Sequence, residues 1–218
     1  MTKRILLCIL LGGVTPCAVA AQGLGFGARV GTLGLGGEVA IGLTEGLVVR
    51  GGMGITPLER GVTFSDVDVT LKLPTVYNVG LDLYLNGAVR LGGGVLLRSG
   101  HPEVTATFSA SQDIGGTSFT PQEIGTLAGV IESSGAAPYV LIGFGRHTAE
   151  GVGLFLDLGF AFMGDPSVRL GARDGTLSDD APPLMDALQR EASDFENDMR
   201  GYLKFWPILS LGIRVGAQ

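Results

Sequence analysis

The sequence predicts an all-β fold, an eight-stranded antiparallel transmembrane β-barrel with one amphipathic helix in its last long loop. The main observation is segment 67–85, where every odd-numbered residue is uncharged while the even-numbered ones include Asp68, Lys72 and Asp82. A period of two indicates a strand with two unlike faces. Strands in soluble proteins average about five or six residues, so a longer strand favours a membrane barrel. An export signal and repeats of this pattern predict the same class.

The first 20 residues are typical of a secretory signal peptide. Two basic residues precede the apolar run 5–11, and small residues at 18 and 20 form a signal-peptidase site, so we expect cleavage after Ala20 or Ala21. A membrane-anchoring helix is the alternative, but the run is short and glycines interrupt it. We therefore expect an exported protein whose mature part, 22–218, is one barrel domain.

Composition argues against several functional classes. Both cysteines, Cys8 and Cys17, lie within the signal, so we expect neither a disulfide framework nor a thiol site in the mature protein. Losing the signal removes two of the 15 basic residues and leaves 13 against 21 acidic ones, a net charge of −8. This balance argues against a nucleic-acid partner. No later apolar stretch approaches the roughly 20 residues of a membrane helix, so the chain could enter a membrane only as a closed barrel.

Four further segments repeat the two-faced pattern. They are 47–55, 89–98, 154–163 and 205–215, and in each one face is free of charge while the other carries charged residues. A soluble sandwich would expose those charged faces to water, whereas a membrane barrel turns the apolar faces to lipid and the polar faces inward. The charged residues expected to line the lumen are Arg29, Glu38, Arg50, Lys72, Asp82, Arg90, Arg98, Asp157, Lys204 and Arg214.

These lumen residues are expected to pair with one another. Eight strands leave an interior that side chains roughly fill, and buried charges need partners. Glu38, Asp82 and Asp157 should therefore each contact an arginine or a lysine. Seven basic residues stand against three acidic ones, so any pore through this lumen should disfavour cations. Whether a water path passes these charges stays open at this point.

The number of strands follows from the turns. Short turns are expected at 43–46, 85–88 and 146–151, and longer polar connections at 57–65, 109–124 and 175–203. Short turns are usually periplasmic and long loops extracellular, so both chain ends should be periplasmic and the number of strands even. The alternation shifts by one residue near 30–34, where a tight hairpin gives a total of eight strands. The alternative is a bulge at this point, with the extra turn at 164–166.

The last long connection contains a helical pattern. Apolar residues recur at spacings of three and four, at Leu184, Leu188, Ala192, Phe195 and Met199. This spacing predicts an amphipathic helix over 179–200, with two prolines at its start and Asp179 or Asp180 as the N-cap. We expect the helix to pack its apolar side over the barrel rim. A lid over the lumen or a docking face for a partner is the alternative.

Three segments of the mature chain resemble a known family. They are "AAPYVLIGFG" (136–145), "GLFLDLGFAFMGDPSVRL" (153–170) and, most specific, "DALQREASDFENDMRGYLKFWPILSLGIRV" (186–215), and they are similar to the small outer-membrane porins of the ornithine-uptake, CarO-like type. A weaker likeness extends back through 27–43. The resemblance implies an eight-stranded outer-membrane barrel and uptake of small amino acids. It carries over no binding-site residue.

We expect an outer-membrane protein that acts as a narrow porin for small solutes such as amino acids. The alternative is a structural or adhesive outer-membrane protein with a filled, non-conducting lumen. Catalysis is not expected, because Ser99 and His101 form no convergent site with other residues, and no cofactor or metal is expected either. The expected partners are outer-membrane lipid and lipopolysaccharide, the barrel-assembly machinery and small amino acids, with no nucleic acid, and the chain is expected to be a monomer.

Overall fold

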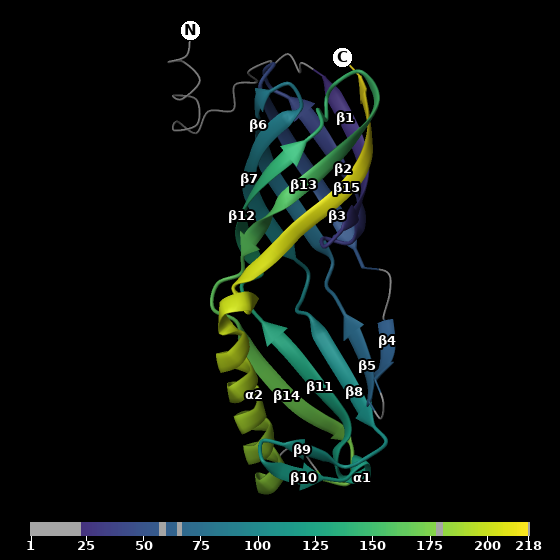
Figure 1. Cartoon of the computed structure of the whole chain (residues 1–218), viewed down its shortest axis with the longest axis vertical. Coiled ribbons are helices and arrows are strands. Elements are labelled where there is room, and N and C mark those ends of the chain that lie inside the picture. The colour runs from purple at the N-terminus through teal and green to yellow at the C-terminus, as the bar shows by residue number, and fades with distance from the viewer. Residues whose placement is uncertain (1–22, 57–59, 65–66, 178–180, 218) are drawn as a thin grey trace, which may run out of the picture.

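The structure is a computed structural model that describes residues 23–56, 60–64, 67–177 and 181–217. The expected signal peptide, 1–20, with Cys8 and Cys17, lies outside the described residues, so its cleavage stays a prediction. The described chain has two parts, a closed barrel and a second β-structure that extends from one end of it (Figure 1).

Eight antiparallel strands close into a barrel, which confirms the predicted fold class. The strands are β1 (Leu24–Gly31), β2 (Leu35–Gly42), β3 (Leu47–Ile55), β6 (Val76–Asn86), β7 (Val89–Arg98), β12 (Ala136–Phe144), β13 (Gly151–Phe162) and β15 (Phe205–Ala217). Around the ring their order is β1, β15, β13, β12, β7, β6, β3 and β2. The ring closes because β1 pairs with both β15 and β2.

The two ends of the barrel differ in their connections. One end, which we call the turn end, holds the short connections predicted at 43–46, 85–88 and 146–151, together with the first and last described residues (Figure 1). From the opposite end, which we call the loop end, three long connections leave the barrel. Both described chain ends therefore lie on the same side, as an even number of strands requires.

The predicted hairpin near 30–34 is confirmed. β1 and β2 are joined by a tight turn in which the Gly34 N–H donates to the Gly31 carbonyl at 3.0 Å. Gly34 has a φ of +88°, a backbone conformation that glycine adopts without steric cost. Segment 164–166 is not a turn between barrel strands, because it leads from β13 into the second β-structure.

Segment 67–85 is two strands in different sheets, so the prediction of one long strand is wrong. β5 (Val67–Lys72) belongs to a separate five-stranded sheet, and β6 belongs to the barrel. Pro74 lies in the break between them, and proline cannot donate a hydrogen bond to a strand ladder. The alternation continues across the break because both sheets have one apolar face. The alternating pattern therefore does not indicate where β5 ends and β6 begins.

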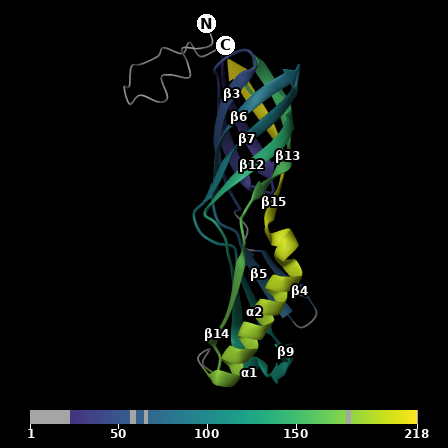
Figure 2. The ribbon, with the colours of Figure 1, turned by 90° about the vertical axis from the view of Figure 1, so that its left-hand side faces the viewer.

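The three long connections fold together into what we call the distal domain. Its elements are β4 (Arg60–Phe64), β5, β8 (Glu103–Phe108), β9 (Gln112–Ile114), β10 (Thr117–Phe119), α1 (Pro121–Ile124), β11 (Gly125–Glu132), β14 (Ser167–Asp174) and α2 (Pro182–Leu203). The sheet order is β14, β11, β8, β5 and β4, and β9 and β10 form a separate hairpin. Figure 2 shows this domain extending the long axis of the barrel. Loops were predicted at 57–65, 109–124 and 175–203, and β5 was predicted as part of a barrel strand, so the second sheet was not predicted.

The predicted amphipathic helix is present as α2, but it does not pack over the barrel rim. It runs beside β14 (Figures 1 and 2). Leu184, Ala187 and Leu188 are buried there in a second core with apolar residues of β9, β10 and α1. The N-cap position falls on Ala181, so the predicted aspartate cap is also wrong. The helix therefore covers part of one face of the distal sheet, on the side of β14.

No helix within the described ranges is long and apolar enough to cross a membrane.

The barrel strands have an apolar outside and a polar inside. On β6, Leu81 is 49% exposed and Leu83 is 48% exposed, whereas the intervening Asp82 is 1% exposed. The same alternation runs around the ring, and every charged residue of the eight barrel strands is buried or half-buried. The outer surface of the barrel is therefore a belt without charge. This arrangement confirms the two-faced pattern of residues 76–85.

Candidate functional site

Six of the ten charged residues expected in the lumen meet inside the barrel. They are Arg29, Glu38, Arg50, Asp82, Arg90 and Asp157, and each is buried. They come from β1, β2, β3, β6, β7 and β13, so strands from all sides of the ring contribute to one cluster. We call these six residues the ion-pair cluster. Inward placement follows from the period of two, which turns alternate side chains to the interior.

Arg50 is the centre of the ion-pair cluster. Its guanidinium contacts all three carboxylates, with Nη1 2.6 Å from Asp157 Oδ2, Nε 3.1 Å from Asp82 Oδ2 and Nη1 3.3 Å from Glu38 Oε2. Arg90 is a second bridge, because its Nη2 donates to Asp157 Oδ1 and its Nε lies 3.4 Å from Asp82 Oδ2. Each carboxylate therefore contacts an arginine, as the sequence analysis expected.

Arg29 closes the side of the cluster nearest β1. Its Nη2 donates to the Asn78 side-chain oxygen at 2.6 Å, and its Nη1 lies 3.7 Å from Glu38 Oε2. The cluster therefore holds three arginines and three carboxylates, which balance. The excess of basic residues that predicted a cation-disfavouring pore is absent from this central cluster.

His147 joins the cluster from the turn end and was missed by the sequence analysis. It lies in the β12–β13 connection, yet its side chain is buried and its Nε2 is 2.5 Å from Glu38 Oε1. Its backbone N–H donates to the Tyr84 hydroxyl at 2.9 Å, and its ring lies 4.7 Å from that of Phe155. Strand alternation ends before this residue, so no sequence pattern indicates where it points.

Glycines make room for the charged side chains. Gly143 pairs with Arg90 across β12 and β7, and a Cβ at Gly143 would collide with the Arg90 guanidinium. Gly92 pairs with Asp82 across β7 and β6, and a Cβ there would collide with the Asp82 carboxylate. Part of the high glycine content of the chain, 37 residues, is therefore a packing requirement of this interior.

The other four predicted lumen residues lie elsewhere. Arg98 is at the loop end, where its Nη2 donates to Ser133 and Ser134, and Arg214 is at the turn end, where its Nη1 donates to the carbonyls of Ala149 and Gly151.

Lys204 and Lys72 lie outside the lumen, so the prediction that they line it is wrong. Lys204 lies between α2 and β15 and pairs with Asp165 at 2.6 Å, with much of its side chain exposed. Lys72 lies on β5 of the distal sheet, where its side chain is 63% exposed and 4.0 Å from Glu103. Neither lies in the lumen, because the barrel strands that follow them begin only at Phe205 and Val76.

An apolar plug fills the lumen between the ion-pair cluster and the loop end. Its buried residues are Leu33, Val76, Leu96, Ala137, Tyr139, Leu141, Ala161, Met163 and Ile208, with Trp206 packed against them. Where the plug meets the cluster, the remaining cavity is about 10 Å³, which is roughly the space of one water molecule. The interior therefore has two layers, one ionic and one apolar.

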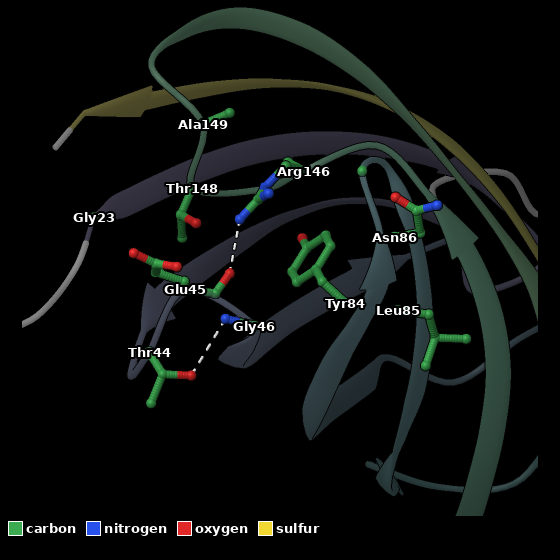
Figure 3. Close-up of a pocket in the computed structure, with 11 residues that line it drawn as sticks. Gly23, Thr44, Glu45, Gly46, Tyr84, Leu85, Asn86, Arg146, Thr148 and Ala149 are labelled. Atoms are coloured by element: carbon green, nitrogen blue, oxygen red, sulfur yellow. Dashed lines mark hydrogen bonds between the residues drawn. The ribbon is translucent and has the colours of Figure 1, made fainter.

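A polar cavity of about 1020 Å³ opens at the turn end (Figure 3). The Arg146 Nη2 donates to the Glu45 carbonyl at 2.7 Å, and the Arg146 guanidinium lies 5.1 Å from the centre of the Tyr84 ring. Thr44, Asn86 and Thr148 also line it. Only turns were predicted at this end of the barrel. This cavity is a wide polar entrance to the lumen. Tyr84, one of its lining residues, contacts His147.

No protein-family model and no curated protein matches the chain. Solved structures do match it in fold. Acinetobacter baumannii CarO2 aligns with a TM-score of 0.62 and 18% identity, over 89% of this chain and 98% of that one. Acinetobacter baumannii CarO aligns with a TM-score of 0.57 and 19% identity, over 88% and 96%.

The fold is similar to that of CarO. The resemblance inferred from the segments at 136–145, 153–170 and 186–215 is therefore confirmed at the level of the fold. Because the alignments cover far more of the chain than the barrel strands, the likeness to CarO includes much of the distal domain.

Proposed function

We propose that this protein is an outer-membrane β-barrel whose lumen stays closed and which presents the distal domain outside the cell as a structural or binding element. The observation that carries the proposal is the two-layered interior, an ion-pair cluster followed by an apolar plug. Breaking a buried ion pair by removing one partner lowers stability by about 3–5 kcal/mol. A water path would have to separate several such pairs and also move the plug.

The outer surface supports a membrane position. Its belt of apolar side chains carries no charge between the two ends, and the closed ring pairs the backbone groups of the strands, as lipid requires. Phe160, Phe162 and Phe205 form an aromatic cluster on this surface near the loop end, with ring centres 5.1–5.9 Å apart. Aromatic girdles at the membrane interface are typical of outer-membrane barrels. The turn end would then face the periplasm.

A gated pore for small solutes such as amino acids is the second candidate. The wide polar entrance at the turn end favours it, because a vestibule of about 1020 Å³ has room for hydrated solutes. Glu45 and Arg146 give this vestibule both charge signs. Conduction would then require a second conformation in which both interior layers separate.

Single-channel recording separates the two candidates. We expect the mature wild-type protein in planar bilayers to show no discrete conductance steps, and liposomes that contain it to swell no faster than empty ones with glycine as solute. A variant that truncates both layers, Arg50→Ala with Arg90→Ala and Leu96→Ala, is the positive control and should conduct. Regular unit steps from the wild-type protein would reject the closed barrel and support the gated pore.

The orientation is tested separately on intact cells. Because both native cysteines lie in the expected signal peptide, single cysteines can be placed without background. An Asp194→Cys variant on α2 should react with a membrane-impermeant maleimide, whereas Glu45→Cys at the turn end should react only after the outer membrane is opened. The reverse pattern would place the distal domain in the periplasm. Outer-membrane lipid, lipopolysaccharide and the assembly machinery are the partners that this placement implies.

A further inference from the structure

A further cavity, unrelated to the lumen, lies in the distal domain between the sheet and α2. Its volume is about 240 Å³. The floor is one face of β8, β11 and β14, with Val104, Ala106, Leu127 and Leu170 among its side chains, and the wall is formed by Glu191 and Phe195 of α2. The lining is almost wholly apolar, and Glu191 supplies its one charged group.

The hollow results from a missing side chain. Gly129 stands in one cross-strand row between Val104 of β8 and Leu170 of β14, so the middle of this apolar row has no side chain. A Cβ built on Gly129 would lie 3.2 Å from Leu170 Cδ2 and 3.9 Å from the Val104 carbonyl. A small apolar residue would therefore occupy part of the cavity rather than collide with the backbone.

The helix leaves this cavity open on one side. α2 buries Leu184 and Leu188 near the β9–β10 hairpin, but Phe195, two turns further along, is 43% exposed. Glu191 stands one turn before Phe195 on the same side of the helix, and its Oε2 accepts the Gly115 N–H at 3.0 Å. This bond fixes the carboxylate at the mouth of the cavity.

We propose that this cavity binds a small amphipathic amine, with its hydrocarbon part on the apolar floor and its ammonium group at Glu191. Apolar walls favour the hydrocarbon part, and the carboxylate at the mouth is complementary to a cation. A cavity of about 150 Å³ accommodates benzene, so 240 Å³ suits a chain of roughly six to eight carbons. The proposal rests on the distal domain being the binding element suggested above.

The test uses hexylammonium as the ligand and methyl NMR of the full mature protein in lipid nanodiscs. We expect saturable shifts of the Val104, Leu127 and Leu170 methyl signals. Hexanol, which lacks the charge, should bind more weakly, and hexanoate should not bind, because it would place a second carboxylate beside Glu191. Equal shifts with hexylammonium and hexanoate would reject the proposal.

Two matched pairs of variants locate the site. Gly129→Val should abolish the saturable methyl shifts caused by hexylammonium, whereas Ala128→Val, on the opposite face of β11, should leave these shifts unchanged. Glu191→Gln keeps an oxygen for the Gly115 N–H and should weaken hexylammonium binding about tenfold, because the neutral amide cannot form a charge-assisted hydrogen bond with the ammonium group. Asp194→Asn removes the same charge from an exposed position of α2 and should have little effect.

The outcomes distinguish this inference from the proposed function. Shifts that persist in Gly129→Val, or no saturable shift with the wild-type protein, would reject the ligand site while leaving the closed barrel untouched. Should Gly129→Val disturb the folded methyl spectrum of the distal sheet, the Glu191→Gln and Asp194→Asn pair still decides. Wild-type conductance steps together with intact hexylammonium binding would reject the closed barrel alone.

Discussion

Arg50 and Asp157 are 107 residues apart in the chain and meet across the full width of the barrel, with 2.6 Å between Arg50 Nη1 and Asp157 Oδ2. Their strands, β3 and β13, stand on opposite sides of the eight-stranded ring. The contact therefore spans the lumen. Because Arg50 also contacts Glu38 and Asp82, this one side chain connects its own strand β3 with β2, β6 and β13.

Replacing Arg50 by methionine should destabilise the barrel by about 3–5 kcal/mol, because three buried carboxylates lose a shared partner. The measurement is urea unfolding of the protein reconstituted in lipid. Lys72→Met is the matched control, since the Lys72–Glu103 pair is exposed, and surface pairs contribute about 0–1 kcal/mol. Similar losses for the two variants would mean that the ion-pair cluster is not a structural centre.

The two interior layers should act as independent seals. Leu96 of the plug is 1% exposed, so Leu96→Ala should lower the free energy of unfolding by about 2–5 kcal/mol. The variant should still show no ion conductance, because the ion-pair cluster still blocks the lumen. Planar-bilayer recording of this single variant checks the expectation. Steady conductance from Leu96→Ala alone would show that the cluster does not hold back ions.

Leucines of the same alternating segment should respond differently to charge. Leu81→Arg on β6 places a cation in the apolar belt and should cost about 2–4 kcal/mol near the membrane midplane. Leu71→Arg on β5 is the control, because Leu71 lies on the distal sheet and is 40% exposed. The yield of heat-modifiable folded protein in lipid vesicles reports both. A comparable loss for Leu71→Arg would argue against a distal sheet outside the membrane.

Gly143→Ala should disturb the ion-pair cluster without changing any charge. Its new methyl group would collide with the Arg90 guanidinium and displace Arg90 from Asp157. We expect a drop in the unfolding midpoint in urea, by the same mechanism as overpacking of a core, at about 1–3 kcal/mol. Gly135→Ala is the control, because no heavy atom lies within 4 Å of that Cβ position. An unchanged unfolding midpoint in both variants would contradict the close contact between Gly143 and Arg90.

The distal domain offers a pH test at α1. The backbone N–H of Thr120 and then its hydroxyl group donate to Glu123, and these bonds lower the pKa of that carboxyl group. Because the folded pKa is the lower one, the capping contribution is present above the ordinary glutamate pKa and is lost as the pH falls through the lowered value. In a carboxyl NMR titration, Thr120→Ala should raise the pKa of Glu123, whereas Ser118→Ala should not.

The barrel was predictable because its signal is local. A period of two turns Asp82 inward and Leu81 outward whatever the rest of the chain does, and the shift of parity near 30–34 marks a hairpin for the same reason. The six members of the ion-pair cluster follow from this rule. Their pairing also follows, since charges in a narrow interior have only one another as partners.

The distal domain and His147 were not predictable, for two different reasons. An open sheet with one apolar face has the same alternation as a barrel strand, so β5 and β6 read as one strand until Pro74 is seen to separate two sheets. His147 follows the end of β12, where alternation no longer specifies a direction. Its position depends on contacts with Glu38 and Tyr84, which are distant in sequence.

The distal sheet has an evolutionary consequence, because it is assembled from three separate connections that are joined by the pairing of β5 with β8 and of β11 with β14. No single connection can be exchanged between homologues without leaving neighbouring strands unpaired, and exposed strand edges promote self-association. Variation in these connections should therefore be correlated. Diversification of the distal domain would proceed by replacing all three together, while the barrel stays constant.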